Sequence, residues 1–234
     1  MTDNLSFSNR LQTVRQRIQR ACEAYGRDPS QVTLLAVSKT RQSEELRSMA
    51  AEGVRRFGEN YLQEALQKIE LLADLGLEWH FIGPIQSNKT RTLAEQFDWV
   101  HSVDRLKLAR RLSEQRPRHL EPLNLCLQVN ISGEQSKSGV SLTALPSLAH
   151  QVAALPNLRL RGLMAIPAPA ENFEQQRIPF RLMRQALEQL QTEGLQLDTL
   201  SMGMSSDLEA AIAEGATLVR VGTALFGPRP PRTV

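Results

Sequence analysis

The chain has 234 residues, of which 41% are hydrophobic and 23% charged, a composition ordinary for a soluble globular protein with a sizeable core. Its 28 basic and 25 acidic residues leave a formal net charge of +3, which is too even a balance to indicate a nucleic-acid surface. No apolar run approaches the roughly 18 residues of a membrane span. The first ten residues lack a secretory signal, so a cytoplasmic protein with no membrane partner is expected. Cys22 and Cys126 match no metal or redox spacing and are expected to be reduced thiols.

The first predicted element is an amphipathic helix within residues 1–31, which form the N-terminal helix and its lead-in. Apolar residues recur at helical spacing from Leu11 to Tyr25, and a glycine suited to ending a helix follows. The apolar run that begins at Val32 then predicts a strand that ends at Lys39.

Residues 43–53 predict a second helix with Ser43 as its candidate cap, and strands and helices alternate from there to the end of the chain. Helical patterns such as residues 60–76 and 180–194 separate the strand-like runs. Each predicted strand except the last is followed by a helix. The eight predicted strands are residues 32–39, 55–60, 78–83, 99–103, 123–132, 158–166, 199–205 and 217–227.

This alternation predicts a single (β/α)₈ TIM-like barrel with an additional N-terminal helix, spanning residues 1–234 as one domain. Helical crossovers return the chain in the same direction, which makes the strands parallel, and eight such units close a barrel. A doubly wound open sheet is the alternative, but no GxGxxG follows the first strand. Because no eighth helix is expected, the N-terminal helix is expected to cover that gap in the outer ring. Residues 228–234 are expected to be a flexible tail.

The loops after strands seven and eight indicate a phosphate site. In barrels of this kind the active site lies at the carboxyl ends of the strands, and these two loops often bind phosphate through backbone N–H groups. Ser205 and Ser206 supply hydroxyls in the first loop, while Gly222 and Thr223 lie in the second. Each residue alone is more typical of a helix cap or of tight packing, but their combination in neighbouring loops favours a phosphate.

Lys39 lies at the same end of the predicted barrel. Desolvation there is expected to lower its pKa, which favours the neutral amine that attacks a carbonyl. A lysine amine beside a phosphate pocket is what pyridoxal 5′-phosphate (PLP) needs to form a Schiff base with a protein. Two alternatives stay open: an aldolase-type lysine that acts on a sugar phosphate, and a lysine that reaches solvent or pairs with a carboxylate such as Glu59.

Arg220 favours the PLP hypothesis. It precedes Gly222 by two residues on the eighth predicted strand, so both point to the same side. A cofactor between Lys39 and the phosphate loops would bring its ring nitrogen near this side chain. Because arginine is always charged and only donates, it would keep the pyridine nitrogen unprotonated and weaken the ring as an electron sink.

Several motifs occur in order over most of the chain. Through these motifs the sequence resembles the pyridoxal phosphate homeostasis proteins, which are single-domain relatives of the alanine racemase barrel. The resemblance implies that Lys39 carries PLP as an internal aldimine and that Arg220 faces the ring nitrogen. Together with the predicted strand ends, it gives no catalytic residue and a cofactor-binding set of Lys39, Asn60, Met204, Ser205, Ser206, Arg220, Gly222 and Thr223. The four histidines show no spacing that predicts a metal site. The motifs are LLAVSKT, FGENYLQEALQK, WHFIGPIQSNKTRTL, VNISGEQSKSG, RGLMAI and SMGMSSDLEAAIAEGATLVRVGTALFG.

Two further positions concern lysine chemistry. Lys137 corresponds to a further lysine of the family, a candidate transient acceptor or regulatory group. Arg41 is a departure, because many relatives carry a second lysine two places after the cofactor lysine. Arginine cannot form a Schiff base, so a handover between lysines at that position is in doubt.

The resemblance implies a non-catalytic carrier that buffers PLP in vitamin B6 homeostasis, affects amino-acid balance and has PLP-dependent apoenzymes as candidate recipients. Racemases of the alanine racemase type use a tyrosine from a second domain, whereas this chain has only Tyr25 and Tyr61. Tyr61 is expected to pack within its helix, with a position at the opening of the barrel as the alternative. A PLP-dependent racemase or decarboxylase is the alternative, and a partner interaction regulated by cofactor occupancy is a third hypothesis. A monomer is expected.

Two other patterns receive simpler interpretations. His80 and His101 lie near strand ends and are expected to be packed core histidines, with a hydrogen bond to cofactor or water as the alternative. Residues 83–90, GPIQSNKT, nearly match a nucleotide-binding loop, but Asn88 replaces its second glycine. This segment is therefore expected to start a helix beside the pocket.

Overall fold

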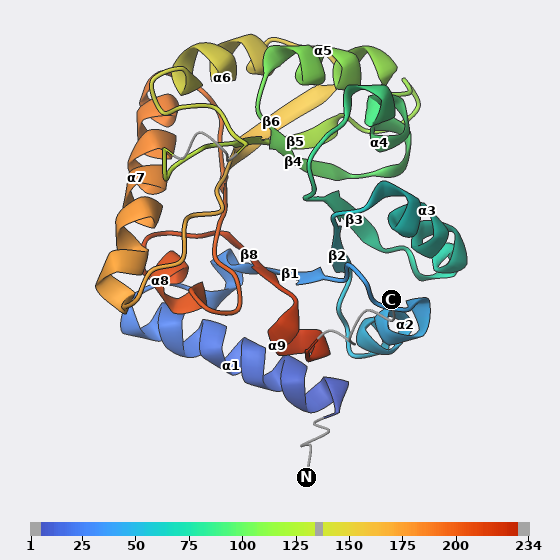
Figure 1. Ribbon diagram of the computed structural model, residues 1–234, viewed down its shortest axis with the longest axis vertical. Coiled ribbons are helices and arrows are strands. Elements are labelled where there is room, and N and C mark those ends of the chain that lie inside the picture. Colours follow the sequence, from blue (N-terminus) through green and yellow to red (C-terminus); the bar gives the residue numbers. More distant parts are fainter. Residues whose placement is uncertain (1–5, 134–137, 229–234) are drawn as a thin grey trace.

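The computed structural model describes residues 6–133 and 138–228. Eight parallel strands form a closed barrel in sequence order, and helices surround it (Figure 1). The predicted (β/α)₈ barrel is confirmed, while most of the predicted tail lies outside the described residues. The strands are β1 (Thr33–Val37), β2 (Arg56–Glu59), β3 (Glu78–Phe81), β4 (Trp99–Val103), β5 (Leu123–Gln128), β6 (Leu158–Met164), β7 (Thr199–Ser201) and β8 (Leu218–Val221).

Helices follow the strands around the outside of the barrel. The first helix lies outside β1 and β8 and packs against the second, eighth and ninth, so it covers the part of the ring assigned to it from the sequence (Figure 1). The helices are α1 (Phe7–Ala24), α2 (Ser43–Ala51), α3 (Leu62–Leu71), α4 (Thr90–Gln96), α5 (Leu106–Gln115), α6 (Leu145–Ala153), α7 (Phe173–Thr192), α8 (Leu208–Ala213) and α9 (Thr223–Phe226), with 3₁₀ turns η1 (Pro29–Gln31), η2 (Ala73–Leu75) and η3 (Ser87–Lys89).

The predicted strand at residues 217–227 is wrong beyond Val221. Gly222 is the N-cap of α9, and the apolar residues that indicated a longer strand form this short helix instead. They are buried there because Phe226 packs edge-on against Phe7 of α1, with ring centroids 6.3 Å apart. A helix therefore does follow the last strand, contrary to the expectation.

The cap predicted for α2 is displaced by one residue. Ser43 is the first residue of the helix, and Gln42 occupies the N-cap position. The backbone N–H of Gln42 donates to the carboxylate of Glu45 at 2.9 Å, which satisfies one donor at the helix start.

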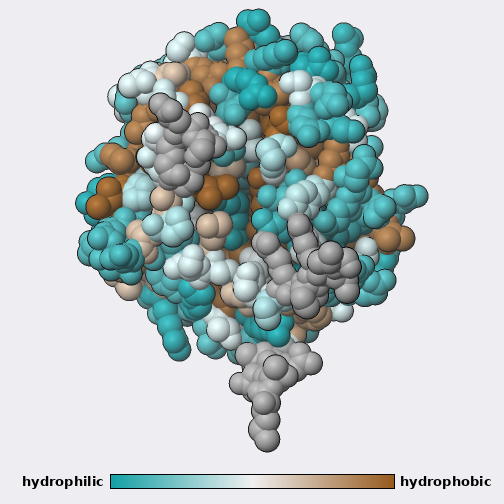
Figure 2. All heavy atoms as spheres, viewed as in Figure 1, coloured by the Kyte–Doolittle hydropathy of each residue, from teal (hydrophilic) through white to brown (hydrophobic). Residues whose placement is uncertain are grey.

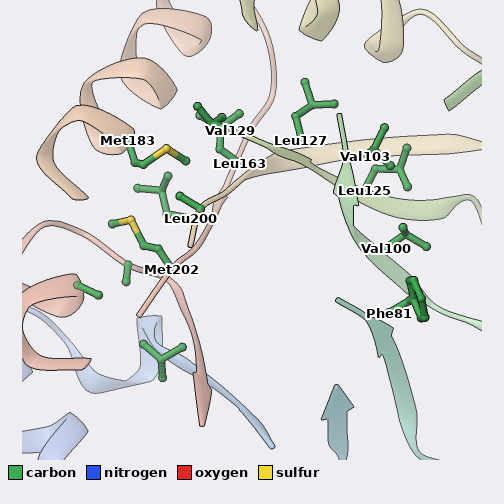
Figure 3. Close-up of a cluster of buried hydrophobic side chains, with 14 of the residues drawn as sticks. Phe81, Val100, Val103, Leu125, Leu127, Val129, Leu163, Met183, Leu200 and Met202 are labelled. Carbon is green, nitrogen blue, oxygen red and sulfur yellow. The ribbon is translucent and has the colours of Figure 1, made fainter. Parts of the chain in front are cut away.

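Alternation along the strands separates two layers of side chains. Phe81, Val100 and Leu163 belong to the main core, and Met183 of α7 lies on the Leu163 side of it (Figure 3). The neighbouring strand positions face the barrel interior. They form small separate clusters, one of Leu35, Ile82 and Leu218 and one of Trp99, Cys126 and Met164.

The barrel interior contains several polar side chains, whereas interiors of such barrels are usually dominated by branched apolar residues. His80, His101, Ser201 and Arg220 are all at most 3% exposed. Buried polar groups require hydrogen-bond partners, so the interior below the strand ends contains an organised network. On the outside, hydrophilic residues cover most of the face shown in Figure 2. No described helix combines the length and hydropathy needed to cross a bilayer.

Candidate functional site

A cavity of about 440 Å³ opens at the carboxyl ends of the strands. All eight residues of the predicted cofactor-binding set line it, although they come from four separate segments of the chain. The structure thus brings the predicted set together around one space. The other lining residues are Val37, Arg41, Ile82 and Ile166.

Lys39 lies half-buried in the turn that follows β1. The next residue, Thr40, has a φ of 63°, which is rare for a β-branched side chain and marks local backbone strain. The carboxylate of Glu64 accepts from the Thr40 backbone N–H at 2.5 Å and helps to hold this conformation. The lysine is therefore presented by a constrained turn.

A buried ion pair supports the same turn from below. Lys68 of α3 donates from Nζ to the Ser38 carbonyl and to Glu59 Oε1, each at 2.7 Å, and to Glu64 Oε1 at 2.5 Å. The Ser38 hydroxyl donates to the same Glu59 oxygen at 2.6 Å. Burial raises the pKa of Glu59, and Lys68 opposes that shift. It is thus Lys68, and not Lys39, that forms the ion pair with Glu59.

The buried ion pair of Lys68 was not predicted, although the sequence contains a pattern that indicates it. Lys68 falls three residues after Ala65 and four before Leu72, on the buried face of its helix. A lysine at such a position is almost never fully buried unless it is paired. This pattern, combined with Glu64 one turn earlier, would have indicated a buried ion pair.

The loops after β7 and β8 form the opposite wall of the cavity. Gly203 has a φ of 92°, and a Cβ there would lie 2.5 Å from that of Ala211, so only glycine fits where this loop turns. In the next loop, a Cβ on Gly222 would lie 3.2 Å from the Val37 carbonyl oxygen. The two loops are joined by a long hydrogen bond of 3.4 Å from the Ala224 N–H to the Ser205 hydroxyl. Ser205 thus contacts the start of α9, and it does not cap α8, whose N-cap residue is Asp207.

The backbone N–H groups of Ser205, Ser206, Gly222 and Thr223 have no acceptor among the described residues. They lie in the two loops that face the cavity. Unpaired N–H groups at helix starts, together with nearby hydroxyls, are suited to oxygen atoms of an anion. This arrangement matches the predicted phosphate site in its chemistry.

Arg220 lies between the cavity and the barrel interior. Its Nη1 donates to the carbonyl and hydroxyl oxygens of Ser201 at 2.6 and 2.9 Å, and its Nη2 donates to the Ala165 carbonyl at 2.9 Å. Burial lowers the pKa of Arg220 to about 10, which leaves it charged at neutral pH. The cavity therefore has a fixed cation that can only donate.

Arg41 lines the cavity but has a structural role of its own. Its guanidinium donates to the carbonyl oxygens of Gly227 and Pro228 at 2.5 and 3.2 Å and lies over the Phe226 ring. It thereby holds the segment after α9 against the turn that contains Lys39. Lys137, the other lysine position of interest, lies outside the described residues.

Neither tyrosine of the chain lines the cavity in the described structure. Tyr61 is the N-cap residue of α3 and is 50% exposed, so the expectation that it packs within its helix was wrong. Tyr25 follows α1 and stacks on Phe173 of α7, and neither ring lines the cavity. The segment at residues 83–90 passes into η3 and then α4, as expected of a helix start.

His80 and His101 do not line this cavity but are buried in the barrel interior, where they hydrogen-bond to each other at 2.9 Å. They are core histidines, as expected, and they belong to a longer polar chain. Burial lowers the pKa of His80, and it lowers that of His101 further, with added repulsion from His80 and Arg220.

These lowered pKa values predict a pH-dependent stability. Histidines in the unfolded chain bind protons below about pH 6.5, while burial opposes protonation of His80 and His101 in the folded state, so stability falls as the pH falls. The free energy of unfolding is expected to lose up to about 2 kcal/mol from this pair between about pH 6.5 and 5.5. Urea unfolding of the wild type and of His101→Gln over this pH range measures the His101 share, about half of the loss, because the other titrating groups are common to both proteins. A wild-type slope equal to that of the variant would contradict the prediction.

The family model of the alanine racemase N-terminal domain matches residues 10–230. The pyridoxal phosphate homeostasis protein of Pseudomonas aeruginosa is 62% identical over 224 residues, which cover 96% of each chain. The chain belongs to the pyridoxal phosphate homeostasis protein family. This confirms the resemblance, and the name of these relatives refers to homeostasis of a cofactor and not to a reaction.

Solved structures of a similar protein, PipY, share the fold. PipY of Synechococcus elongatus without PLP has a TM-score of 0.86 and 40% identity, covering 95% of this chain and 100% of that one. PipY with PLP bound has a TM-score of 0.79 and 39% identity, covering 91% of this chain and 100% of that one. A barrel that is 39% identical to this chain therefore holds PLP.

Proposed function

We propose that the chain binds PLP in the 440 Å³ cavity, as a Schiff base on Lys39, and acts as a monomeric carrier that buffers the cofactor. The observation that carries the proposal is the convergence of all eight predicted residues on one cavity. They supply a lysine amine on one wall and unpaired N–H groups on the other. The PLP-bound structure of PipY supports the same assignment.

The lining residues offer contacts to the ring, the phosphate and a hydroxyl group of the cofactor. Val37, Ile82 and Ile166 provide apolar surface for a flat ring, while the two loops after β7 and β8 provide donors for phosphate oxygens. Asn60 adds a polar group, because its Oδ1 is buried without a hydrogen-bond partner in the described part of the chain. A buried polar atom of this kind needs a partner, and a ligand hydroxyl would supply one.

The residues around the cavity favour carriage over catalysis. Bound PLP supplies an aldehyde for the lysine and a ring that withdraws electrons. Arg220 would face the ring nitrogen as a permanent cation and donor, which opposes protonation of that nitrogen and weakens the withdrawal of electrons. Since neither tyrosine lines the cavity, neither occupies the position of a second acid–base group there.

The absorption spectrum of the purified protein, before and after borohydride, tests the proposal. The wild type is expected to show a yellow band that borohydride removes, with reduced cofactor found on Lys39 by mass spectrometry. Lys39→Ala is expected to lose this attachment completely, whereas Lys107→Ala, which removes an exposed lysine of α5, is expected to keep it. A wild type that stays colourless with added PLP would reject the proposal and favour a sugar phosphate as the partner of Lys39.

The carrier role has a separate test. Protein loaded with PLP is mixed with a PLP-dependent apoenzyme, and recovery of that enzyme's activity is followed over time. Transfer faster than release of PLP into buffer is expected for a carrier that acts on recipients. Steady turnover of an amino acid by the loaded protein alone would instead favour a racemase or decarboxylase.

A further inference from the structure

Five side chains of the barrel interior form a continuous hydrogen-bond chain below the cavity. It begins at Glu78 and ends at Arg220, and four strands contribute to it: β3, β4, β7 and β8. We call this set the interior chain. Its links are Glu78 Oε1 to His80 Nε2 at 2.7 Å, His80 Nδ1 to His101 Nε2 at 2.9 Å, His101 Nδ1 to Ser201 Oγ at 2.8 Å, and Ser201 Oγ to Arg220 Nη1 at 2.9 Å.

The two ends of the interior chain give it a direction. Arg220 can only donate, so Ser201 accepts from it and has its own hydroxyl proton left to donate onward. Glu78 is an acceptor when ionised, and its hydrogen bond with His80 lowers its pKa. With neutral imidazoles, a single pattern satisfies every link: each group accepts from its neighbour on the Arg220 side and donates toward Glu78.

This pattern fixes the tautomers of both histidines. His101 accepts the Ser201 hydroxyl at Nδ1 and therefore carries its proton on Nε2. The Nδ1 of His80 accepts the hydrogen bond from this Nε2–H of His101. The Nε2–H of His80 then donates to Glu78. A charged His80 would reverse the His80–His101 and His101–Ser201 links, but the complete burial of His80 opposes a charge.

The chain also explains how a buried guanidinium is stabilised. Among the described residues, Arg220 has no carboxylate within ion-pair distance, and its acceptors are two carbonyls and one hydroxyl. Hydrogen bonds in series polarise one another, so the negative charge of Glu78 makes the Ser201 oxygen a stronger acceptor. Glu78 is thereby coupled to Arg220 through two neutral imidazoles.

The far end of the interior chain is open to a second cavity of about 370 Å³, which His80 and Glu78 help to line. The Glu78 side chain is 37% exposed and is paired with Arg56 at 3.1 Å. The charged groups that act on His80 are Glu78, Asp98 and Arg56, and those that act on His101 are His80 and Arg220. Solvent at the opposite end of the barrel therefore reaches only the acidic end of the chain.

We propose that the interior chain positions Arg220 for the cofactor ring, with Ser201 and His101 as positioning residues that act through it and both histidines held as neutral Nε2–H tautomers. The part that concerns the cofactor rests on the proposed function. The tautomers and their order belong to the protein without any ligand, and they can be measured separately.

Nuclear magnetic resonance of the ¹⁵N-histidine-labelled protein without cofactor is the first test. Long-range ¹H–¹⁵N correlations distinguish the two neutral tautomers and the charged ring of each histidine. His80 and His101 are expected to remain Nε2–H tautomers from about pH 8 to about pH 5.5, with exposed His119 as internal reference. An Nδ1–H tautomer in either residue, or a charged ring at neutral pH, would overturn the proposal whether or not PLP binds.

Ser201→Ala is the second test, because it removes one acceptor of Arg220 and leaves both carbonyl acceptors. The variant is expected to bind PLP about 10- to 100-fold more weakly, with a shifted absorption maximum and a changed pH profile of the band. Ser201→Thr, which restores the hydroxyl, is expected to recover the wild-type spectrum. If Ser201→Ala folds and keeps the wild-type affinity, maximum and pH profile, the chain has no part in positioning. If the wild type itself forms no Schiff base, the proposed function fails while the tautomer result still stands.

Discussion

Lys68→Met is expected to lower the free energy of unfolding by about 3 to 5 kcal/mol. Its ammonium is the cation that pairs with Glu59, and the two side chains are only 4% and 0% exposed. Removal of one member of such a pair leaves an uncompensated charge in the barrel wall. Urea unfolding at neutral pH measures the loss, which should be among the largest for a single substitution outside the hydrophobic core.

The double variant Lys68→Met, Glu59→Gln is the matched control. A glutamine oxygen can still accept the Ser38 hydroxyl, but it carries no charge that needs a partner. Most of the lost stability is therefore expected to return, since replacement of both members of a buried pair is often nearly neutral. A loss below about 1 kcal/mol in the single variant would show that Glu59 is already protonated in the folded protein.

Lys68→Met is also expected to slow attachment of the cofactor. The Ser38 carbonyl that Lys68 holds precedes Lys39 directly, and the Glu64 carboxylate shared by Lys68 holds Thr40 on its other side. Loss of this support lets the strained turn relax away from its left-handed conformation. The rate of band formation after mixing with PLP, compared between the variant and wild type, reports this effect separately from stability.

Thr223→Glu is expected to weaken PLP binding by about 100-fold or more, because like charges placed together cost several kcal/mol. Thr223 lies beside the unpaired N–H groups of the loops after β7 and β8, where the phosphate is proposed to bind. A carboxylate there would both repel the phosphate and occupy its donors. Absorbance titration with PLP measures the change.

Two comparisons make this prediction specific to the phosphate. Pyridoxal, which lacks the phosphate, is expected to bind the variant and the wild type with similar affinity. Thr223→Val removes only a hydroxyl of nearly the same shape, so its effect on PLP is expected to be about 2- to 10-fold. If Thr223→Glu weakens pyridoxal as much as PLP, the phosphate is not held by these loops.

The order of the elements could be predicted because it depends on local pattern. Apolar residues at spacings of two and of three to four define strands and helices over a few residues each, and their alternation implies parallel strands in a barrel. The same logic failed at residues 217–227, where an apolar run was predicted as one strand. Tertiary packing decided this point, since Phe226 is buried in α9 against α1.

The positions of the cavity residues could also be predicted, since side chains at the carboxyl ends of parallel strands meet at one end of a barrel. The partners of the buried polar side chains around the cavity could not be predicted. Lys68 is bonded to a carbonyl 30 residues away, and His101 to a hydroxyl 100 residues away. Nothing in the local sequence around His101 indicates Ser201.

By itself, the sequence determined the barrel, the family and the residues at the carboxyl ends of the strands, because periodicity and motifs are properties of short segments. Only the tertiary structure decided which buried groups are paired: Lys68 with Glu59, and the interior chain from Glu78 to Arg220. The physical reason is closure of the barrel. Closure brings β3, β4, β7 and β8 around one interior, where water is excluded and each polar atom must find its partner across the barrel.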